Sequence, residues 1–432
     1  MKICIFEDQK YDNFYPMTMT RPVFELRCGK TTLMEKIKRE LPVAETVYFL
    51  REHLAAVFKE NVKDGLVNNL KALKDDVFIV NGRLLPKKGD LKLEGDEEIA
   101  VKGEDIVYAR VKKATMEKML AGSLEDTLKN LREELSTKET DLTLIEYPWD
   151  LINENSKAIE EDFKALGSGI RGDVHSTCVI LGDKENLYIA KTAKIYPYVV
   201  LDVENGPIII DEGAVIHPFS RIEGPSAIGE NCLILGGKIR SGSSFGPVCR
   251  VSGETEECII HGYANKYHIG FLGHSYVGKW VNIGALTTSS DLKNNYTTVQ
   301  IYFKGKIVDT KTQKLGSFIG DHCKFSIGCL LNTGSVIGVA CNILTSGELT
   351  PRYIPSFCWY LRGRLSRGAG FKKTIITERT MMARRGIEMT KAYEKLLRRI
   401  YEETEEEREK LIRKSRAEAL LKESIHDEMV AK

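Results

Sequence analysis

The sequence lacks the usual marks of a membrane, secreted or nucleic-acid-binding protein. Nowhere do about 20 apolar residues sit together, and residues 1–16 contain no apolar run long enough for a signal peptide. The 63 Lys and Arg balance 61 Asp and Glu, so the net charge of +2 gives no global field that would attract nucleic acid or an anionic membrane. The ten cysteines form no C-x-x-C pair, which favours reduced structural thiols over disulfides or zinc. We therefore expect a soluble cytoplasmic protein with no nucleic-acid partner, no membrane insertion and no bound metal.

Aliphatic residues recur at six-residue spacing through the middle of the chain. The three series are Ile210, Ile216, Ile222, Ile228 and Ile234; Leu233, Ile239, Phe245 and Val251; and Ile319, Phe325, Leu331, Ile337 and Ile343. A period of six fits neither the 3.6 of a helix nor a two-sided strand, but it fits a triangular prism in which each of three short strands per coil supplies one inward aliphatic. The pattern therefore predicts a parallel β-helix. Small residues such as Cys232 and Cys323 fall at corner positions, where we expect buried fillers.

Four segments differ in pattern. Residues 1–145 alternate apolar strands with helices, which is typical of an α/β domain with a mainly parallel sheet. Residues 146–184 read as a helical linker, and residues 185–358 hold the hexapeptide repeats. Residues 359–432 are rich in charge with apolar residues at helical spacing, which predicts two C-terminal helices. Glu residues interleave with the basic ones there, which favours a solvated amphipathic face over nucleic-acid binding.

Two stretches interrupt the repeats, at about 252–270 and 290–317, and insertions in a solenoid commonly form its binding face. Between them lies GFLGHSYVGKWVNIGA, which contains His274, Tyr276 and Asn282. Acyl transfer from a thioester needs a group that accepts the acceptor's proton, and a His is suited to that near neutral pH. A His beside Gly in a loop is by itself usually structural. The polar neighbours make His274 a candidate base, with Tyr276 and Asn282 placed to fix hydroxyls or an amine.

H-S-Y-V-G followed by V-N-I-G-A resembles the acyltransferase domain of the bifunctional N-acetylglucosamine-1-phosphate uridyltransferase / glucosamine-1-phosphate acetyltransferase family over about residues 205–345. The resemblance implies a left-handed β-helix of hexapeptide repeats that forms a homotrimer and uses acetyl-CoA as co-substrate. It also implies that His274 is the general base and that Tyr276 and Asn282 contact an amino sugar. One residue separates His274 from Tyr276 where the family has two, so His274 sits one place off the family's base position.

The same resemblance suggests ligands for a sugar phosphate. Arg240 in I-R-S-G matches a phosphate-binding Arg, and Asp291 falls where the family has a substrate-contacting Asn. The family's second phosphate ligand, a Lys, has no clear counterpart, and Arg250 or Lys266 would supply that charge. Through F-E-D, T-R-P-V-F-E-L-R, N-G-R-L-L-P, N-K-x-H and S-D-L-K-N, the whole chain also resembles a divergent branch of sugar nucleotidyltransferase-like proteins.

The first domain departs from what a uridyltransferase needs. Residues 6–21 lack the glycines that cradle a triphosphate, Pro22-Val23 replaces the family's Pro-Lys, and Arg83 lies near the family's metal position. Magnesium is therefore expected only if this domain is active. Four basic residues remain candidates for binding an anionic nucleotide: Arg21, Arg27, Lys30 and Arg83.

Three functions follow from these patterns. The main expectation is an acetyltransferase that moves an acetyl group from acetyl-CoA to a sugar phosphate such as glucosamine 1-phosphate, in nucleotide-sugar synthesis. The first alternative is a sugar-1-phosphate nucleotidyltransferase of the UDP-N-acetylglucosamine diphosphorylase type, carried by the N-terminal domain with the β-helix as scaffold. The second is a non-catalytic nucleotide-sugar-binding or assembly protein. Acceptor-dependent thiol release, pyrophosphate release, or neither would separate the three.

Overall fold

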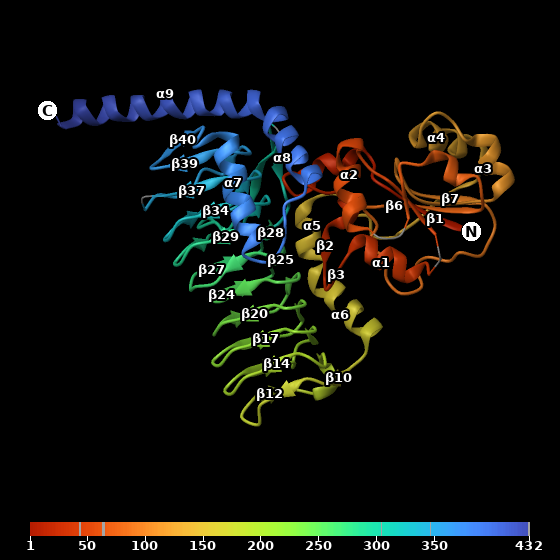
Figure 1. Cartoon of the computed structure of the whole chain (residues 1–432), viewed down its shortest axis with the longest axis horizontal. Coiled ribbons are helices and arrows are strands. Elements are labelled where there is room, and N and C mark those ends of the chain that lie inside the picture. Colours follow the sequence, from red (N-terminus) through yellow and green to blue (C-terminus); the bar gives the residue numbers. More distant parts are fainter. Residues whose placement is uncertain (43–44, 63–64, 304, 346, 431–432) are drawn as a thin grey trace. The chain divides into compact units, whose positions relative to one another are not determined.

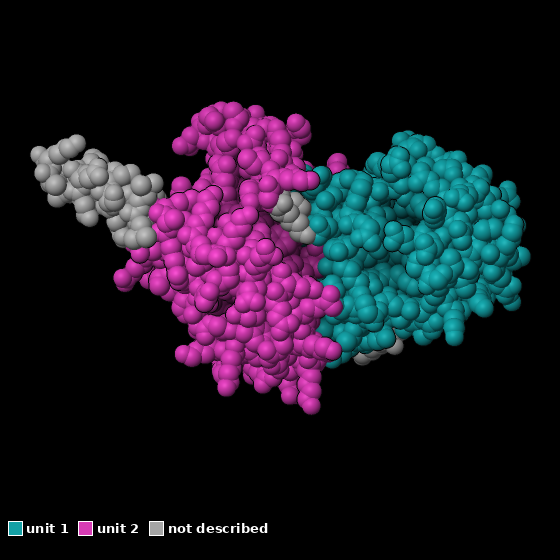
Figure 2. Space-filling view, turned by 90° about the horizontal axis from the view of Figure 1, so that it is seen from above, with its two compact units in different colours: residues 1–14, 20–27, 31–150 teal, residues 15–19, 28–30, 151–432 magenta. Residues whose placement is uncertain are grey.

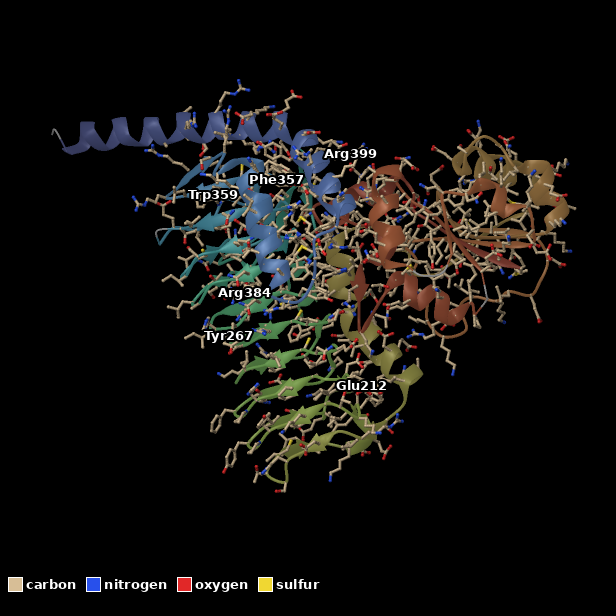
Figure 3. All side chains as sticks on the ribbon, viewed as in Figure 1. Glu212, Tyr267, Phe357, Trp359, Arg384 and Arg399 are labelled. Atoms are coloured by element: carbon tan, nitrogen blue, oxygen red, sulfur yellow. The ribbon has the colours of Figure 1, made fainter. Side chains whose placement is uncertain are left out.

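The computed structural model describes residues 1–42, 45–62, 65–303, 305–345 and 347–430. Residues 43–44 and 63–64 of the expected N-terminal domain and 431–432 of the expected C-terminal helices lie outside these ranges. The chain divides into two compact units, coloured separately in Figure 2. Unit 1 contains Met1–Phe14, Thr20–Arg27 and Thr31–Asp150, and unit 2 contains Tyr15–Met19, Cys28–Lys30 and Leu151–Lys432. The units are therefore interleaved along the sequence.

Unit 1 is built on a seven-stranded sheet. Its order is β5 (Leu66–Val67), β4 (Thr46–Phe49), β1 (Lys2–Phe6), β6 (Val77–Asn81), β8 (Asp105–Val111), β7 (Glu98–Lys102) and β9 (Thr137–Glu139). The first four strands are parallel, and β8 runs antiparallel to both β6 and β7. The apolar strands are buried because helices pack against the sheet. The predicted α/β domain is confirmed.

Two helices of the first half of the chain, α1 (Leu33–Glu40) and α4 (Leu124–Glu134), begin at a residue whose side chain caps the first turn. In α1, the Thr32 hydroxyl accepts a hydrogen bond from the Glu35 N–H, and the Glu35 carboxylate accepts one from the Thr32 N–H. This capping box satisfies two otherwise unpaired N–H groups. The remaining helices are α2 (Glu52–Asn61), α3 (Lys113–Met119), α5 (Pro148–Asn153) and α6 (Asn155–Leu166).

Unit 2 contains a triangular prism of short parallel strands, stacked coil upon coil in Figure 1. Face 1 consists of β10 (Gly169–Ile170), β13 (Leu187–Ile189), β16 (Ile208–Ile210), β19 (Ser226–Ile228), β22 (Ser243–Phe245), β25 (Ile259–Gly262), β28 (Tyr276–Lys279), β33 (Phe318–Ile319), β36 (Val336–Ile337) and β38 (Tyr353–Ile354). Face 2 consists of β11 (Asp173–Val174), β14 (Lys194–Ile195), β17 (Val215–Ile216), β20 (Leu233–Ile234), β23 (Arg250–Val251), β26 (Asn265–Lys266), β29 (Asn282–Ile283), β34 (Lys324–Phe325), β37 (Asn342–Leu344), β39 (Trp359–Leu361) and the antiparallel β40 (Arg364–Ser366). Face 3 consists of β12 (Val179–Leu181), β15 (Val200–Asp202), β18 (Arg221–Glu223), β21 (Lys238–Ile239), β24 (Glu254–Glu256), β27 (Phe271–Gly273), and then the pair β30 (Thr288–Ser289) and β35 (Leu330–Leu331). The predicted left-handed β-helix is confirmed.

The hexapeptide aliphatics stack in register inside the prism. On face 1, Ile210 pairs with Ile228, and Ile228 pairs with Phe245. All three side chains are at most 2% exposed. The corner cysteines are also buried, and each thiol donates to the carbonyl of a neighbouring coil; they are Cys232, Cys323, Cys329 and Cys341. The side chains at the repeat positions are therefore the ones that fill the core.

The prism is longer than residues 185–358. Its first coil begins at β10, and β39 and β40 form a hairpin beyond residue 358. Three C-terminal helices follow where two were expected: α7 (Gly370–Ala383), α8 (Lys391–Glu403) and α9 (Glu405–Val430), all visible in Figure 1. The additional helix is α7. Its buried face includes the charged Glu378, so its sequence does not show the apolar stripe of an amphipathic helix. Within the described ranges, no helix combines the length and apolarity needed to cross a bilayer.

Candidate active site

His274 lies at the corner that joins face 3 to face 1. Backbone hydrogen bonds stack this corner coil on coil: the Glu257 N–H donates to Ser241, the His274 N–H to Glu256, and the Gly316 N–H to His274. Both Glu257 (φ +49°) and His274 (φ +44°) adopt the left-handed conformation. This conformation costs energy in a non-glycine residue. The ladder of hydrogen bonds holds the two side chains at a sharp turn, outside the apolar core.

His274 forms a close pair with Asp291, which follows β30. The His274 Nδ1 and Asp291 Oδ2 atoms are 2.8 Å apart, and the side chains are 13% and 14% exposed. Because a carboxylate only accepts hydrogen bonds, Asp291 places the proton of a neutral His274 on Nδ1 and leaves Nε2 as the basic atom. Among the described residues, no hydrogen bond to Nε2 is present. A Cβ at Gly273 would lie 2.2 Å from Asp291 Oδ2, so only glycine admits this pairing.

Charged groups surround the pair on the coils below. The Glu256 carboxylate is 2.8 Å from the Arg240 guanidinium and 3.8 Å from the Lys314 ammonium. Burial raises the pKa of the neighbouring Glu257, and the positive charge of protonated His274 opposes that rise. Arg240 therefore stands at the same corner as His274, but its charge is already balanced by a carboxylate.

Three other predicted ligands lie on other sides of the prism. Tyr276 is fully buried on face 1, with its hydroxyl 3.0 Å from His261 Nδ1. Asn282 lies on face 2, where its carbonyl oxygen accepts from the Asn265 amide at 2.8 Å. Arg250 also belongs to face 2. Within one copy of the chain, these residues do not converge with His274.

Lys266 is a structural residue of the prism interior. Its side chain is 3% exposed, and its ammonium donates to the carbonyls of Ser252 (2.7 Å), Gly270 (2.6 Å) and His268 (3.4 Å). All three N–H donors of the ammonium are therefore used. Burial lowers the pKa of Lys266 to about 8. The expected phosphate-binding role is not compatible with this geometry, and Lys266 is left out of the proposed site.

Arg83 is buried in unit 1, at the end of β6. It is 0% exposed, and its guanidinium lies 2.7 Å from Asp8, 2.9 Å from Asp105 and 3.5 Å from Glu146. The Lys10 ammonium bonds to Asp105 at 2.6 Å. Burial opposes ionisation of Asp105, but hydrogen bonds and charge from Lys10 and Arg83 outweigh it and lower its pKa. A guanidinium thus fills the centre of the carboxylate cluster, and these residues do not fit a magnesium ion.

A cavity of 590 Å³ opens in unit 1 beside the carboxyl ends of β1 and β4. Ligands of open α/β sheets bind at that edge. Its lining holds four carboxylates and the single guanidinium of Arg51, which bonds to Glu7 and stacks 3.9 Å from the Tyr11 ring centre. Arg21, Arg27 and Lys30 do not line it. Sequence reasoning missed Arg51, although its place directly after the β4 strand was a usable signal.

The other predicted basic residues have different surroundings. Arg21 is 4% exposed, and its carbonyl accepts a hydrogen bond from Arg51. Arg27 is half-buried. Lys30 belongs to unit 2, where its ammonium is 2.6 Å from Asp211. The four residues proposed for an anionic nucleotide therefore do not form one cluster.

A second cavity, of 430 Å³, lies next to the His274–Asp291 pair. Ser290 and Leu292, the chain neighbours of Asp291 on either side, are among its lining residues. Its lining also contains Lys293 and Arg352. Neither residue was predicted, since Lys293 lies within a long polar insertion and Arg352 lies beyond the family motif. The fold and this corner thus define a parallel β-helix protein with a His–Asp pair beside a polar cavity.

Known proteins that are similar in sequence to this chain carry sugar nucleotidyltransferase or GlmU names. Residues 3–170 match the family model described as sugar nucleotidyl transferase. The chain is similar to a bifunctional sugar-1-phosphate nucleotidylyltransferase/acetyltransferase of Sulfurisphaera tokodaii, with 31% identity over 149 residues, 32% of this chain and 35% of the relative. The chain thus spans about a third of that relative's length. It is also similar to a bifunctional protein GlmU of Methanococcus maripaludis, with 24% identity over 383 residues, 77% of this chain and 92% of the relative.

A solved UDP-N-acetylglucosamine acyltransferase from Campylobacter jejuni aligns with 52% of this chain and 95% of its own, at 12% identity and a TM-score of 0.25. A score this low carries no argument about function. The family model and the relatives confirm the predicted resemblance to sugar nucleotidyltransferases and to bifunctional nucleotidylyltransferase/acetyltransferases.

Proposed function

We propose that unit 2 is an acetyltransferase that transfers an acetyl group from acetyl-CoA to a sugar phosphate, with an amino sugar 1-phosphate as the acceptor to test first. The observation that carries this proposal is the 2.8 Å contact between His274 and Asp291. A carboxylate-oriented imidazole with a free second nitrogen is the arrangement that activates a nucleophile for acyl transfer. The printed name of the Sulfurisphaera tokodaii relative, which includes acetyltransferase activity, supports the same reaction.

In the proposed reaction, the acceptor nitrogen attacks the thioester carbonyl while His274 Nε2 takes its proton. The C–S bond then breaks, the acetyl group stays on the nitrogen, and the proton passes from His274 to the leaving CoA thiolate. Asp291 holds the imidazole in the required tautomer and stabilises the imidazolium formed between the two steps. No other group of this chain is needed to move the proton.

The test is thiol release from acetyl-CoA with glucosamine 1-phosphate, comparing the parent with His274→Ala. His268→Ala is the matched control, because His268 is an exposed His close to His274 in the chain but on the other side of β27. Loss of general-base catalysis is expected to lower the rate about 10²- to 10⁴-fold in His274→Ala only. Loss in His268→Ala with a normal His274→Ala would move the base to His268. No release with any amino sugar phosphate would reject the acetyltransferase.

A second candidate function is nucleotide-sugar chemistry in unit 1. The match of residues 3–170 to sugar nucleotidyl transferases and the 590 Å³ cavity favour it. The acidic lining of that cavity suits the hydroxyls and base of a nucleoside better than a bare triphosphate. Pyrophosphate release from UTP and a sugar 1-phosphate, with and without magnesium, tests for turnover. Binding of UDP-sugar without turnover would instead support the non-catalytic reading.

We also propose that the β-helix forms a homotrimer, an assembly that rests on the family resemblance. Sedimentation equilibrium of the full chain measures it directly. Three times the chain mass of 48.7 kDa is the expected result. A monomer or dimer would reject the trimer and leave the acetyltransferase proposal to the thiol assay.

A further inference from the structure

The cavity next to Asp291 is lined by described residues among which none is acidic. The described residues that line it are Ser290, Leu292, Lys293, Asn294, Asn295, Asn332, Thr333, Leu349 and Arg352. Two cations, three amides and two hydroxyls thus face 430 Å³ of space in a chain whose acidic and basic residues are nearly balanced. Cavities of this size hold small molecules, and amide and hydroxyl groups fix the orientation of polar ligands. The lining is suited to a polar anion.

Arg352 supplies a guanidinium that nothing in the described part of the chain neutralises. No hydrogen bond or ion pair joins its side chain to another described residue. An exposed arginine is usually only hydrated, and exposure alone would carry no argument. What marks Arg352 is its place on a cavity wall whose described residues include no carboxylate. Its five N–H donors are arranged in a fork that matches two phosphate oxygens.

Lys293 is held in position on the same wall. Its ammonium donates to the Thr297 hydroxyl at 2.5 Å and to the Thr298 carbonyl at 3.0 Å. These bonds use two of its three N–H donors and leave its charge uncompensated. A fixed ammonium with one free donor adds charge to the cavity without the entropy cost of ordering a flexible side chain.

The predicted phosphate ligands compare poorly with this pair. Arg240 lies 2.8 Å from Glu256, and the ammonium of Lys266 is used by three carbonyls. An anion at Arg240 would meet the Glu256 carboxylate, and like charges at short range repel. The Arg352 cavity has no such competitor among its lining residues.

The cavity is also within reach of the His274–Asp291 pair. Ser290 and Leu292, its lining residues, flank Asp291 in the chain. Arg352 precedes β38, and three coil steps of about 4.8 Å along face 1 separate that corner from the His274 corner. A ligand whose phosphate lies in the cavity can therefore extend along face 3 toward His274.

We propose that Arg352 and Lys293 form a phosphate-monoester subsite in this cavity. Its use in catalysis rests on the proposed acetyltransferase function, whereas the binding itself does not. Two substrates of that reaction carry the group: the sugar phosphate through its 1-phosphate, and CoA through its 3′-phosphate. The amides of Asn294, Asn295 and Asn332 supply hydrogen bonds to the remainder of either ligand.

Calorimetric titration of the full chain tests the subsite without turnover. The ligands are glucosamine 1-phosphate, CoA and dephospho-CoA, and the variants are Arg352→Met and Arg362→Met. Arg362 is the matched control because it is an exposed arginine in the turn between β39 and β40, outside the cavity. Loss of charge-assisted hydrogen bonds is expected to weaken one ligand about 10- to 100-fold in Arg352→Met only. Arg352→Lys should restore part of the affinity through its charge.

The ligand that weakens identifies the source of the phosphate. Weakening of CoA but not of dephospho-CoA assigns the subsite to the 3′-phosphate, and weakening of glucosamine 1-phosphate alone assigns it to the acceptor. Equal binding by the parent and Arg352→Met, or no binding of either ligand by the parent, would overturn the proposal. Thermal midpoints of the variants confirm that each is folded. Phosphate binding in a protein with no thiol release would retain the subsite and reject only the acetyltransferase.

Discussion

Replacing Glu378 by Gln should release the C-terminal helices from the β-helix. Glu378 on α7 is 1% exposed, and its carboxylate lies 2.7 Å from His322 Nδ1 and also pairs with Lys324. His322 is 0% exposed, and its Nε2 is 2.8 Å from the Tyr393 hydroxyl on α8. One buried imidazole of the prism thus connects both helices. Removing one charge of a buried pair typically costs about 3–5 kcal/mol, because the partner stays buried and unpaired.

Hydrogen exchange of α7 and α8 measures this loss. A cost of about 3–5 kcal/mol corresponds to exchange roughly 10²- to 10⁴-fold faster in the Glu378→Gln variant. The matched control is Glu394→Gln, which breaks the Arg379–Glu394 pair between the same two helices. Both members of that pair are partly exposed, so its loss should cost at most about 1 kcal/mol. Equal exchange in the two variants would refute the buried-clamp reasoning.

The clamp should also weaken in acid. Burial opposes ionisation of Glu378, but the charges and hydrogen bonds of His322 and Lys324 outweigh it and lower the pKa of Glu378 below its ordinary value of 4.5. A depressed carboxyl pKa stabilises the folded state fully above the unfolded pKa and ceases to do so as the pH falls through the folded value. Exchange of α7 in the parent should therefore accelerate below about pH 4.5, and Glu378→Gln should lack that dependence.

Three further substitutions separate catalytic from structural roles. Asp291→Asn should lower kcat about 10²- to 10⁴-fold in the thiol assay with little change in thermal midpoint, because the wrong His274 tautomer is favoured; unchanged kcat would exclude the pair. Lys266→Met should lower the free energy of unfolding, measured by urea denaturation, by about 1–3 kcal/mol, because it leaves buried carbonyls unpaired. A raised KM without destabilisation would instead show that Lys266 binds the substrate. Arg83→Met should lower the free energy of unfolding of unit 1 by about 3–5 kcal/mol. It should also reduce the loss of stability below pH 3.8, because Asp105 would keep Lys10 but lose Arg83, one of the two groups that depress its pKa; an unchanged acid midpoint would contradict this.

The fold could be predicted from the sequence because the repeated aliphatic residues are the ones buried in the prism. Ile210, Ile228 and Phe245 stack in register on face 1, as their spacing predicts. The same register explains the error about Lys266. It pairs with Val251 on face 2 and points into the prism, but the two residues are 15 positions apart, so a count in steps of six does not reach Lys266.

The site was less predictable because its parts come from distant coils and an insertion. His274 and Asp291 were each named, and their spacing of 17 residues equals one coil at this level, as between Ile259 and Tyr276, so the length of a coil rather than the six-residue period brings them together. Arg352 enters the cavity from a later coil, and only the stacking of coils places it there. Likewise, α7 was not predicted because a charged residue, Glu378, lies on its buried face. The partner that compensates this charge is His322, which lies 56 residues earlier in the chain.

The interleaving of the two units limits how the chain can be divided. The three-residue segment Cys28–Lys30 belongs to unit 2, where the Gly29 N–H donates to Asn155 at 2.6 Å and Lys30 pairs with Asp211. No single peptide bond therefore separates the two units. A fragment that starts at residue 151 would leave the buried Asn155 amide and the Asp211 carboxylate without these partners. Any division of the chain into two independently folding proteins would therefore have to supply unit 2 with a replacement for Cys28–Lys30.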